Sequence, residues 1–136
     1  MEKHIDIEKD VVSFQQAINL CMIGFNEKTL CAYEIENQEL YLCHLDEEGL
    51  YMPEKDMPAP LRSQVFRWFR EKKLHNTFPS IIQTRNWATL YRIVEWHPGN
   101  DSTSIITSDY YDTYEEAENA CIDKLIELAK QQDNGR

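Results

Sequence analysis

The chain contains little glycine and proline and no closely spaced cysteine pair. Only four glycines and five prolines occur among its 136 residues, which argues against a disordered or low-complexity protein. The glycines are isolated from one another, so no glycine-rich phosphate loop is present. The four cysteines form no C-x-x-C pair and their spacing fits no zinc pattern. We therefore expect no metal site and no cofactor, and we expect reduced, mostly buried thiols.

Long apolar runs and positive charge are scarce as well. No stretch of about 18 apolar residues occurs, so we expect no membrane span. Residues 1–10 alternate in charge without an apolar run, which predicts no signal peptide and a cytoplasmic location. Fourteen Lys and Arg against 24 Asp and Glu give a net charge of −10. That balance disfavours direct nucleic-acid binding of the ordinary basic kind.

The one basic part of the chain is residues 58–75, where five Lys and Arg stand against one Glu. Within it, 59–73 is typical of an amphipathic helix, with Pro60 at the first helical position. Arg67 and Arg70 fall opposite the apolar arc, so we expect both to be exposed. The expected core-facing arc comprises Leu61, Val65, Phe66, Trp68 and Phe69.

Two further helices are predicted from capping boxes, in which Ser or Thr is followed three residues later by Gln or Glu. Ser13 opens a helix over 13–23, and Gly24 suits its left-handed stop. Thr113 opens a second helix that runs to about Lys130. The expected buried stripes are Phe14, Ala17, Ile18, Cys21, Met22 and Phe25 in the first, and Tyr114, Ala117, Cys121, Leu125 and Leu128, flanked by Ile122 and Ala129, in the second.

Five strands are predicted from alternation and from β-branched and aromatic residues. Two of them join at Asn37-Gln38 with Ile35 opposite Leu40, and the proline-containing stretch 51–58 is expected to be a loop. The fold class predicted is α+β: one domain over 1–136, ordered helix, two strands, helix, three strands, helix, with an antiparallel sheet and helices mainly on one face. Residues 1–11 and 131–136 are expected to be frayed. The predicted strands are 29–35, 39–45, 78–84, 87–96 and 103–111.

Few residues suggest chemistry. His44 lies beside the acids of 46–48, but a metal would need further ligands that cannot be identified, and a solvated hairpin end explains the group better. A Cys–His nucleophile pair has no local signature. Glu115, Glu116 and Glu118 belong to a helix's first turn. The aromatic residues Trp87, Tyr91 and Trp96 are compatible with a base-stacking platform, but we favour a sheet packed under helices.

Three stretches together resemble a group of small uncharacterised proteins encoded by bacteriophages and prophages of gut bacteria. They are Val12–Leu20 ending in Gly24-Phe25, Ala59–Leu61 leading into Val65–Lys72, and Tyr111–Ala117. The resemblance implies a mobile-element origin and a host-cytoplasm setting. It implies no catalytic residue, because that group has no known activity to carry over.

The functional expectation is a non-enzymatic accessory protein that binds an unidentified host or phage protein. Its exposed charges are the expected contact residues: Arg67, Arg70, Glu116, Asp123 and Glu127. One alternative is an acidic nucleic-acid mimic that inhibits a host DNA-binding protein, supported by the charge of −10 and weakened by the basic helix. Another is a small enzyme of unrecognised class, which a pocket with converging titratable groups would favour. The oligomeric state is left open.

Overall fold

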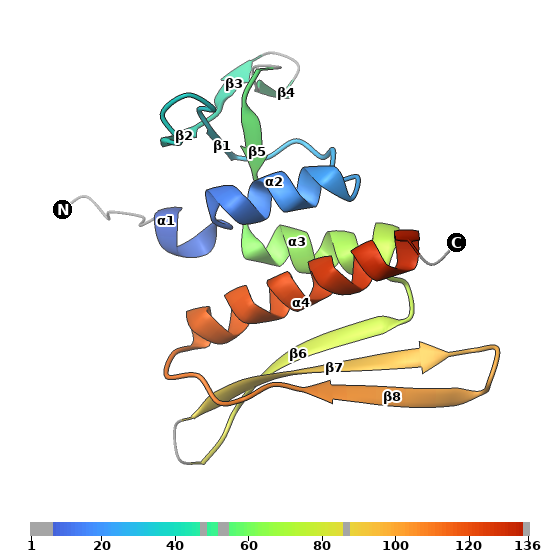
Figure 1. Ribbon diagram of the computed structural model, residues 1–136. Helices are drawn as coiled ribbons and strands as arrows, with labels where there is room; N and C mark the ends of the chain where they lie inside the picture. The colour runs from blue at the N-terminus through green and yellow to red at the C-terminus, as the bar shows by residue number, and fades with distance from the viewer. Residues whose placement is uncertain (1–6, 47–48, 52–54, 86–87, 135–136) are drawn as a thin grey trace. The chain divides into compact units, whose positions relative to one another are not determined.

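The computed structural model describes residues 7–46, 49–51, 55–85 and 88–134, and the fold is α+β (Figure 1). The chain divides into two compact units, the first ending at Gln64 and the second beginning at Val65. A single domain over 1–136 stays a prediction. No helix in the described part of the chain is long and apolar enough to cross a membrane.

Unit 1 begins with two helices, α1 (Ile7–Asp10) and α2 (Phe14–Met22). The predicted capping box is confirmed, because the Gln16 N–H donates to Ser13 Oγ at 3.1 Å and the Ser13 N–H donates to Gln16 Oε1 at 3.0 Å. Gly24 has a φ of +106°, so it ends the helix in the left-handed region where glycine is favoured.

Two predictions about this segment are wrong. Residues 7–11 are not frayed, because α1 is helical and Val11, only 3% exposed, forms a β-bridge with Leu61. Met22 is 71% exposed, whereas Leu20 is fully buried. Leu20 and Ile23 give this helix a second apolar stripe next to the predicted one, and the helix buries that side instead.

Unit 1 also contains a three-stranded antiparallel sheet in the order β2-β1-β5. Its strands are β1 (Cys31–Tyr33), β2 (Leu40–Leu42) and β5 (Met57–Ala59). The predicted pairing of Ile35 with Leu40 is wrong, because Tyr33 pairs with Leu40. The connection spans 34–39 and contains Gln38 at a φ of +57°. A shift of two residues leaves each side chain on its predicted face of the sheet.

Strand β5 begins in the stretch 51–58, which was predicted to be a loop, and ends at Ala59. Pro58 pairs with Ala32. The Glu34 N–H donates to the Glu39 carbonyl, and backbone groups two residues apart on a strand point the same way, so those of Ala32 also point toward β2. The missing N–H of Pro58 therefore falls where β1 offers no acceptor. The predicted strand 39–45 also divides at Cys43, after which β3 (His44–Asp46) pairs with β4 (Gly49–Tyr51).

The predicted central helix starts later and changes its winding. Helix α3 spans Arg62–Trp68 and continues as a π-helix, η1 (Phe69–Lys73), whose end is marked by the Leu74 N–H donating to the Phe69 carbonyl at 2.6 Å. Pro60 lies outside the helix, because Leu61 is held in the β-bridge to Val11. The predicted burial is confirmed for Val65, Trp68 and Phe69, while Leu61 and Phe66 are half-buried.

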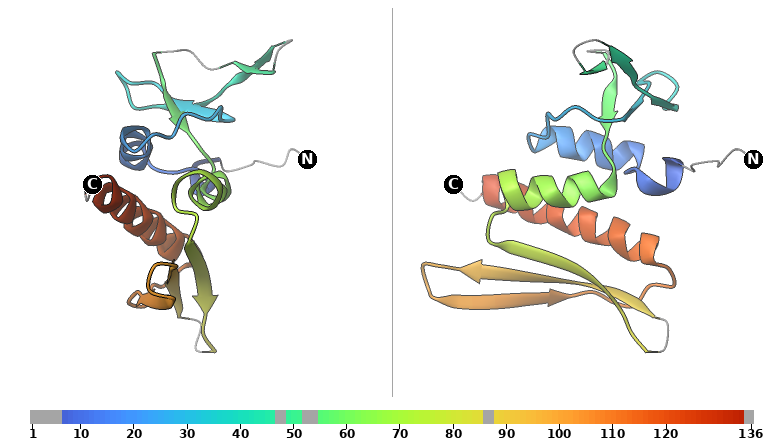
Figure 2. Two further views of the ribbon diagram at one scale, coloured as in Figure 1. Left: turned by 90° about the vertical axis from the view of Figure 1, so that its right-hand side faces the viewer. Right: turned by 180° about the vertical axis from the view of Figure 1, so that it is seen from behind.

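Unit 2 is a three-stranded antiparallel sheet with one long helix on it. The sheet order is β6 (Thr77–Gln83), β7 (Thr89–His97) and β8 (Ser102–Thr107). Helix α4 (Tyr114–Asn134) lies against β6 and β7 (Figures 1 and 2). Ile93 is fully buried, as are Ile122 and Leu125 of α4. The prediction of one sheet is thus replaced by separate sheets in the two units.

The ends of α4 depart from the sequence prediction. The helix continues past Lys130 to Asn134, so 131–134 are not frayed. Tyr114, predicted to be buried, is 52% exposed, and Ile126 is buried. Ala117, Cys121 and Leu125 are buried as predicted, so the covered face keeps this part of the stripe, extends to Ile126 and does not reach Tyr114.

Candidate functional site

A pocket of about 420 Å³ opens in unit 2 where four segments meet. The segments are the end of η1, the start of β6, the end of β7 and the last turns of α4. Most of the lining groups are polar, and they include one indole, two imidazoles and three side-chain amides. The lining residues are Lys73, Leu74, His75, Asn76, Thr77, Glu95, Trp96, His97, Leu128, Gln131 and Gln132.

Local backbone contacts hold this pocket in place. The Trp96 N–H donates to the Asn76 carbonyl at 2.8 Å, which joins the end of β7 to the residue before β6. At the rim, Lys73 Nζ lies 2.9 Å from Asp133 Oδ2, which fixes the last residue of η1 to the last turn of α4. The wide π turn sets the direction in which Lys73 leaves the helix.

A serine, a histidine and a glutamate lie together at the end of β7. Ser104 Oγ is 2.8 Å from His97 Nε2, and Glu95 Oε2 is 3.9 Å from the same ring nitrogen. Glu95 and His97 share one face of β7 by alternation, and Ser104 is paired with Glu95 across the hairpin. The sequence analysis did not predict this trio. The pattern Glu-x-His followed by a tight turn could have indicated that Glu95 and His97 share a face near the end of a hairpin.

The trio does not have the geometry of a nucleophilic triad. In such a triad the carboxylate binds the ring nitrogen opposite to the one that faces the nucleophile, and so orients the base. Here both neighbours approach Nε2, which leaves Nδ1 without the orienting carboxylate. The geometry therefore favours a surface hydrogen bond over acyl-transfer chemistry.

The other candidate chemistry from the sequence does not assemble in the described residues. No group of three His, Cys, Asp or Glu side chains among them is placed to hold a metal ion. Tyr91 and Trp96 point to opposite faces of β7, because their positions differ by an odd number. Tyr91 stacks on Tyr111 at a centroid distance of 6.4 Å instead. Trp87 lies outside the described residues, as do Glu47 and Glu48 of the His44 group.

The four cysteines are free thiols that differ in how far they are buried. Cys31 and Cys121 are buried, while Cys21 and Cys43 are half-buried. Burial raises the pKa of Cys121 to about 12, with a further contribution from Glu118. Cys21 was expected on a buried stripe and is half-buried. Burial raises the pKa of Cys21 as well. A raised pKa suppresses the thiolate, which opposes nucleophilic chemistry at these positions.

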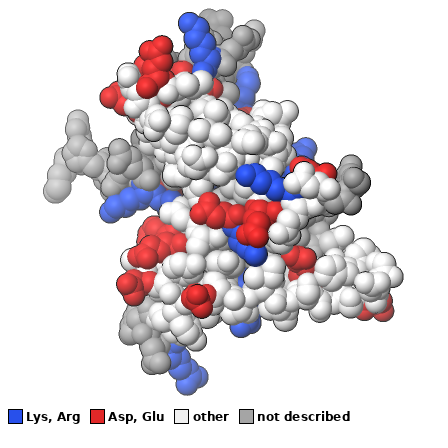
Figure 3. Space-filling model, in the orientation of Figure 1, with Lys and Arg blue, Asp and Glu red and all other residues white. Residues whose placement is uncertain are grey.

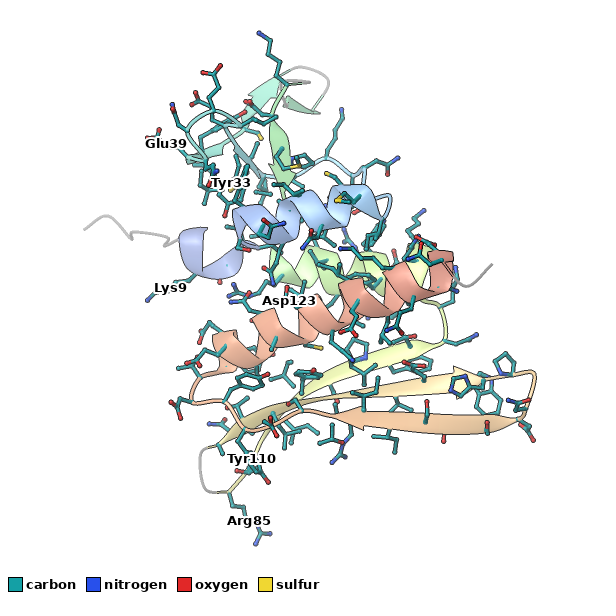
Figure 4. The ribbon with its side chains drawn as sticks, in the orientation of Figure 1. Lys9, Tyr33, Glu39, Arg85, Tyr110 and Asp123 are labelled. Atoms are coloured by element: carbon teal, nitrogen blue, oxygen red, sulfur yellow. The ribbon has the colours of Figure 1, made fainter. Side chains whose placement is uncertain are left out.

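In unit 1, a tyrosine hydroxyl and an aspartate carboxylate lie close together beside the three-stranded sheet. The Tyr41 hydroxyl donates to Asp56 Oδ2. Burial raises the pKa of Tyr41, and the adjacent Asp56 raises it further. Tyr41 is thus held as a neutral hydrogen-bond donor, and the pair ties β2 to the residue that precedes β5. In the same unit, Tyr33 (labelled in Figure 4) reaches the segment before α2, where its hydroxyl donates to the Val12 carbonyl at 2.7 Å.

All five contact residues predicted from the sequence are exposed, on α3, η1 and α4. Acidic side chains gather over α4 on the face shown in Figure 3. Two of these carboxylates are already engaged within the helix. Glu116 Oε1 accepts from the Thr113 hydroxyl at 3.1 Å, and Glu127 Oε2 lies 3.4 Å from Lys124 Nζ. The five are Arg67, Arg70, Glu116, Asp123 and Glu127.

None of those five residues lines the pocket. The pocket was not predicted because its lining comes from four segments that alternation and helical periodicity treat separately.

No protein-family model matches the chain, and neither a curated protein nor a solved structure is significantly similar to it.

Proposed function

We propose that this chain acts by binding a partner protein, and that the pocket of unit 2 receives part of that partner. The supporting observation is the pocket's lining. It offers an indole, two imidazoles and three amides around about 420 Å³, and their arrangement includes no oriented nucleophile and base. Indole and amide groups are common anchors of protein recognition, because they combine apolar area with hydrogen bonding.

The lining fits a peptide segment better than a typical small metabolite. Pockets for small ligands are mostly apolar with a few polar groups, whereas the apolar part here is limited to Leu74, Leu128 and the Trp96 ring. The amides of Asn76 and Gln131 can each donate and accept a hydrogen bond. A main chain, which alternates donors and acceptors, would satisfy such a lining.

The acidic-mimic alternative receives less support from the side-chain contacts. A nucleic-acid mimic needs carboxylates presented to solvent in a phosphate-like array. Glu116 serves the cap of α4, Glu127 faces Lys124, and Asp133 is paired with Lys73. The resemblance to proteins encoded by phages and prophages of gut bacteria directs the search to proteins of a bacterial host.

The proposal is tested by affinity capture from a gut-bacterial lysate, followed by mass spectrometry. The double variant His75→Ala/Gln132→Ala removes two exposed lining side chains. Arg85→Ala is the matched control, since Arg85 lies at the far end of the sheet (Figure 4). We expect a protein that is retained by the wild type and the control and lost by the double variant. Equal retention by all three chains would overturn the proposed site.

The charged residues form a second arm of this experiment. Exposed charges affect association rate and salt dependence more than affinity. Raising salt from about 50 to 500 mM, where the screening length falls to a few ångströms, should slow association. Changing Glu116, Asp123 and Glu127 to Lys and, separately, Arg67 and Arg70 to Glu identifies the side that matters. Loss of capture only with the acidic set would favour the mimic.

A further inference from the structure

The sheet of unit 2 has two edge strands, and β6 is the edge that is blocked against a further strand. The Trp96 N–H donates to the Asn76 carbonyl, so the even-numbered residues of β6 bond to β7 and the odd-numbered ones face the open edge. Pro79 lies at one of those outward positions and has no N–H. Thr77 is another, and its N–H already donates to the Leu74 carbonyl at 3.2 Å.

The other edge, β8, has none of this protection. The Ser108 N–H donates to the Tyr91 carbonyl at 3.0 Å, which places the even-numbered residues of this strand toward β7. Thr103, Ile105 and Thr107 therefore direct both their N–H and C=O groups outward. Within the described part of the chain, β8 pairs with β7 alone.

An apolar row runs across the sheet and ends at this open edge. Phe78 pairs with Val94, and Val94 pairs with Ile105, so the three side chains lie side by side on the face opposite α4. Phe78 is 50% exposed and Ile105 is 61% exposed. An apolar row beside unpaired backbone groups is a template for a further strand.

The composition of β8 points to a second copy of this chain as that strand. Its sequence, Ser-Thr-Ser-Ile-Ile-Thr, contains no charged residue and no proline, and Figure 3 shows mostly uncharged surface over it. Within these six residues, two chains of net charge −10 therefore place no like charges opposite one another. The outward positions also read Thr-Ile-Thr, which is the same in both directions, as a two-fold interface requires.

We propose that two copies pair through β8, antiparallel about a two-fold axis at Ile105. Ile105 then exchanges both backbone hydrogen bonds with its counterpart, and Thr103 exchanges them with Thr107 of the second copy. The apolar row becomes continuous from Phe78 of one copy to Phe78 of the other. The proposal is independent of the partner protein proposed above, because it uses none of the pocket residues.

The association is measured by sedimentation equilibrium of the full chain between about 10 µM and 1 mM, since an edge contact is small and affinities in this range are expected. We expect the mass to rise with concentration from 16.1 kDa toward twice that value. Higher salt should strengthen the dimer by screening the repulsion between two acidic chains. A chain that stays monomeric throughout would overturn the proposal.

Charge variants at the axis test the register. Ile105→Lys and Ile105→Glu each place like charges opposite one another across the axis, so each alone should weaken the dimer by about tenfold or more. Mixing the two should restore it as a heterodimer. Gln83→Lys makes the same charge change on β6 and should leave the dimer intact. A dimer that survives Ile105→Lys, or a mixture that fails to associate, would place the contact elsewhere.

Amide hydrogen exchange gives a readout that needs no variant. At low concentration the N–H groups of Ser104 and Ile106 should be protected by β7 while those of Thr103, Ile105 and Thr107 exchange quickly. At high concentration all five should be protected. If the outward amides become protected only after a foreign protein is added, the strand that pairs with β8 belongs to that protein and the proposed dimer is wrong.

Discussion

The guanidinium of Arg62 donates a hydrogen bond to the main-chain carbonyl of Val11 at 3.3 Å, across 51 residues of chain. A second nitrogen of the same group donates to the carbonyl of Lys9. Arg62 is 5% exposed, so these bonds form away from solvent. The first residue of α3 thereby fixes the segment that joins α1 to α2.

Replacing Arg62 by Ala should lower the free energy of unfolding by about 1–3 kcal/mol, because it removes a donor from the carbonyl of the buried Val11. Arg67→Ala is the matched control, since Arg67 is exposed and its loss should change stability by less than about 0.5 kcal/mol. Urea denaturation of both variants measures the difference. Equal midpoints would show that water replaces the guanidinium at no cost.

Trp68→Ala should be among the most destabilising single substitutions, with a loss of about 3–5 kcal/mol. Trp68 is 4% exposed and its ring meets Phe69 edge-on at a centroid distance of 5.0 Å. The loss combines the burial free energy of the side-chain atoms that are removed with the cost of the cavity left behind. A near-native thermal midpoint for this variant would contradict the burial.

The two capping serine and threonine hydroxyls should each contribute about 0.5–2 kcal/mol. Ser13→Ala removes the acceptor of the Gln16 N–H, and Thr113→Ala removes that of the Glu116 N–H, each at 3.1 Å. Chemical denaturation of Ser13→Ala and Thr113→Ala is the measurement, and Ser13→Asp, which retains a capping acceptor, is the control. Unchanged stability in both alanine variants would mean that other groups cap these helices.

The four thiols should react with a thiol reagent in an order set by exposure. Cys21 and Cys43 are half-buried and should be modified before Cys31 and Cys121, which are buried. All four should react slowly at neutral pH, because burial raises the pKa of each and the thiolate is the reactive form. Mass mapping at timed intervals gives the order. Early labelling of Cys121 would contradict the packing of α4.

Stability should fall as the pH rises above about 9. The pKa of Cys121 is about 12 in the folded chain against 9.0 for an ordinary thiol, so above pH 9 the unfolded chain loses this proton first. The unfolded state then binds fewer protons, and the free energy of unfolding decreases by up to about 1.4 kcal/mol per pH unit for this group. Cys121→Ala should flatten the decrease. If the free energy of unfolding falls equally steeply with pH in the wild type and in Cys121→Ala, the decrease comes from other groups.

Capping residues in the sequence predicted two helix starts, at Ser13 and Thr113, and one helix end, at Gly24. The cap at Ser13 and the stop at Gly24 depend on residues within four positions of one another, and both occur as predicted. The exposure of Arg67 and Arg70 also follows from helical spacing alone. Such features need no knowledge of what packs against the helix.

Features that depend on distant partners were not predictable in this way. Pro58 indicated a loop, and only its position opposite Ala32 explains why it is tolerated in β5. Met22 is exposed because the helix buries the neighbouring stripe. The candidate pocket collects residues from four segments. The trio of Glu95, His97 and Ser104 depends on the register of the β7–β8 hairpin. Sequence periodicity carries no information about that register beyond the alternation of faces.

The π turn of η1 makes chain length, as well as residue identity, a determinant of the pocket. A π turn bonds each N–H one residue further back than an α turn does, so it is what a helix becomes when one residue is inserted. The Leu74 N–H bonds to Phe69 in this way. Deleting one residue between them would rewind the segment as an α-helix and rotate everything after the deletion, Lys73 included, by about 100° relative to Trp68. Insertion and deletion in this segment would therefore remodel the pocket in steps that substitution cannot reach.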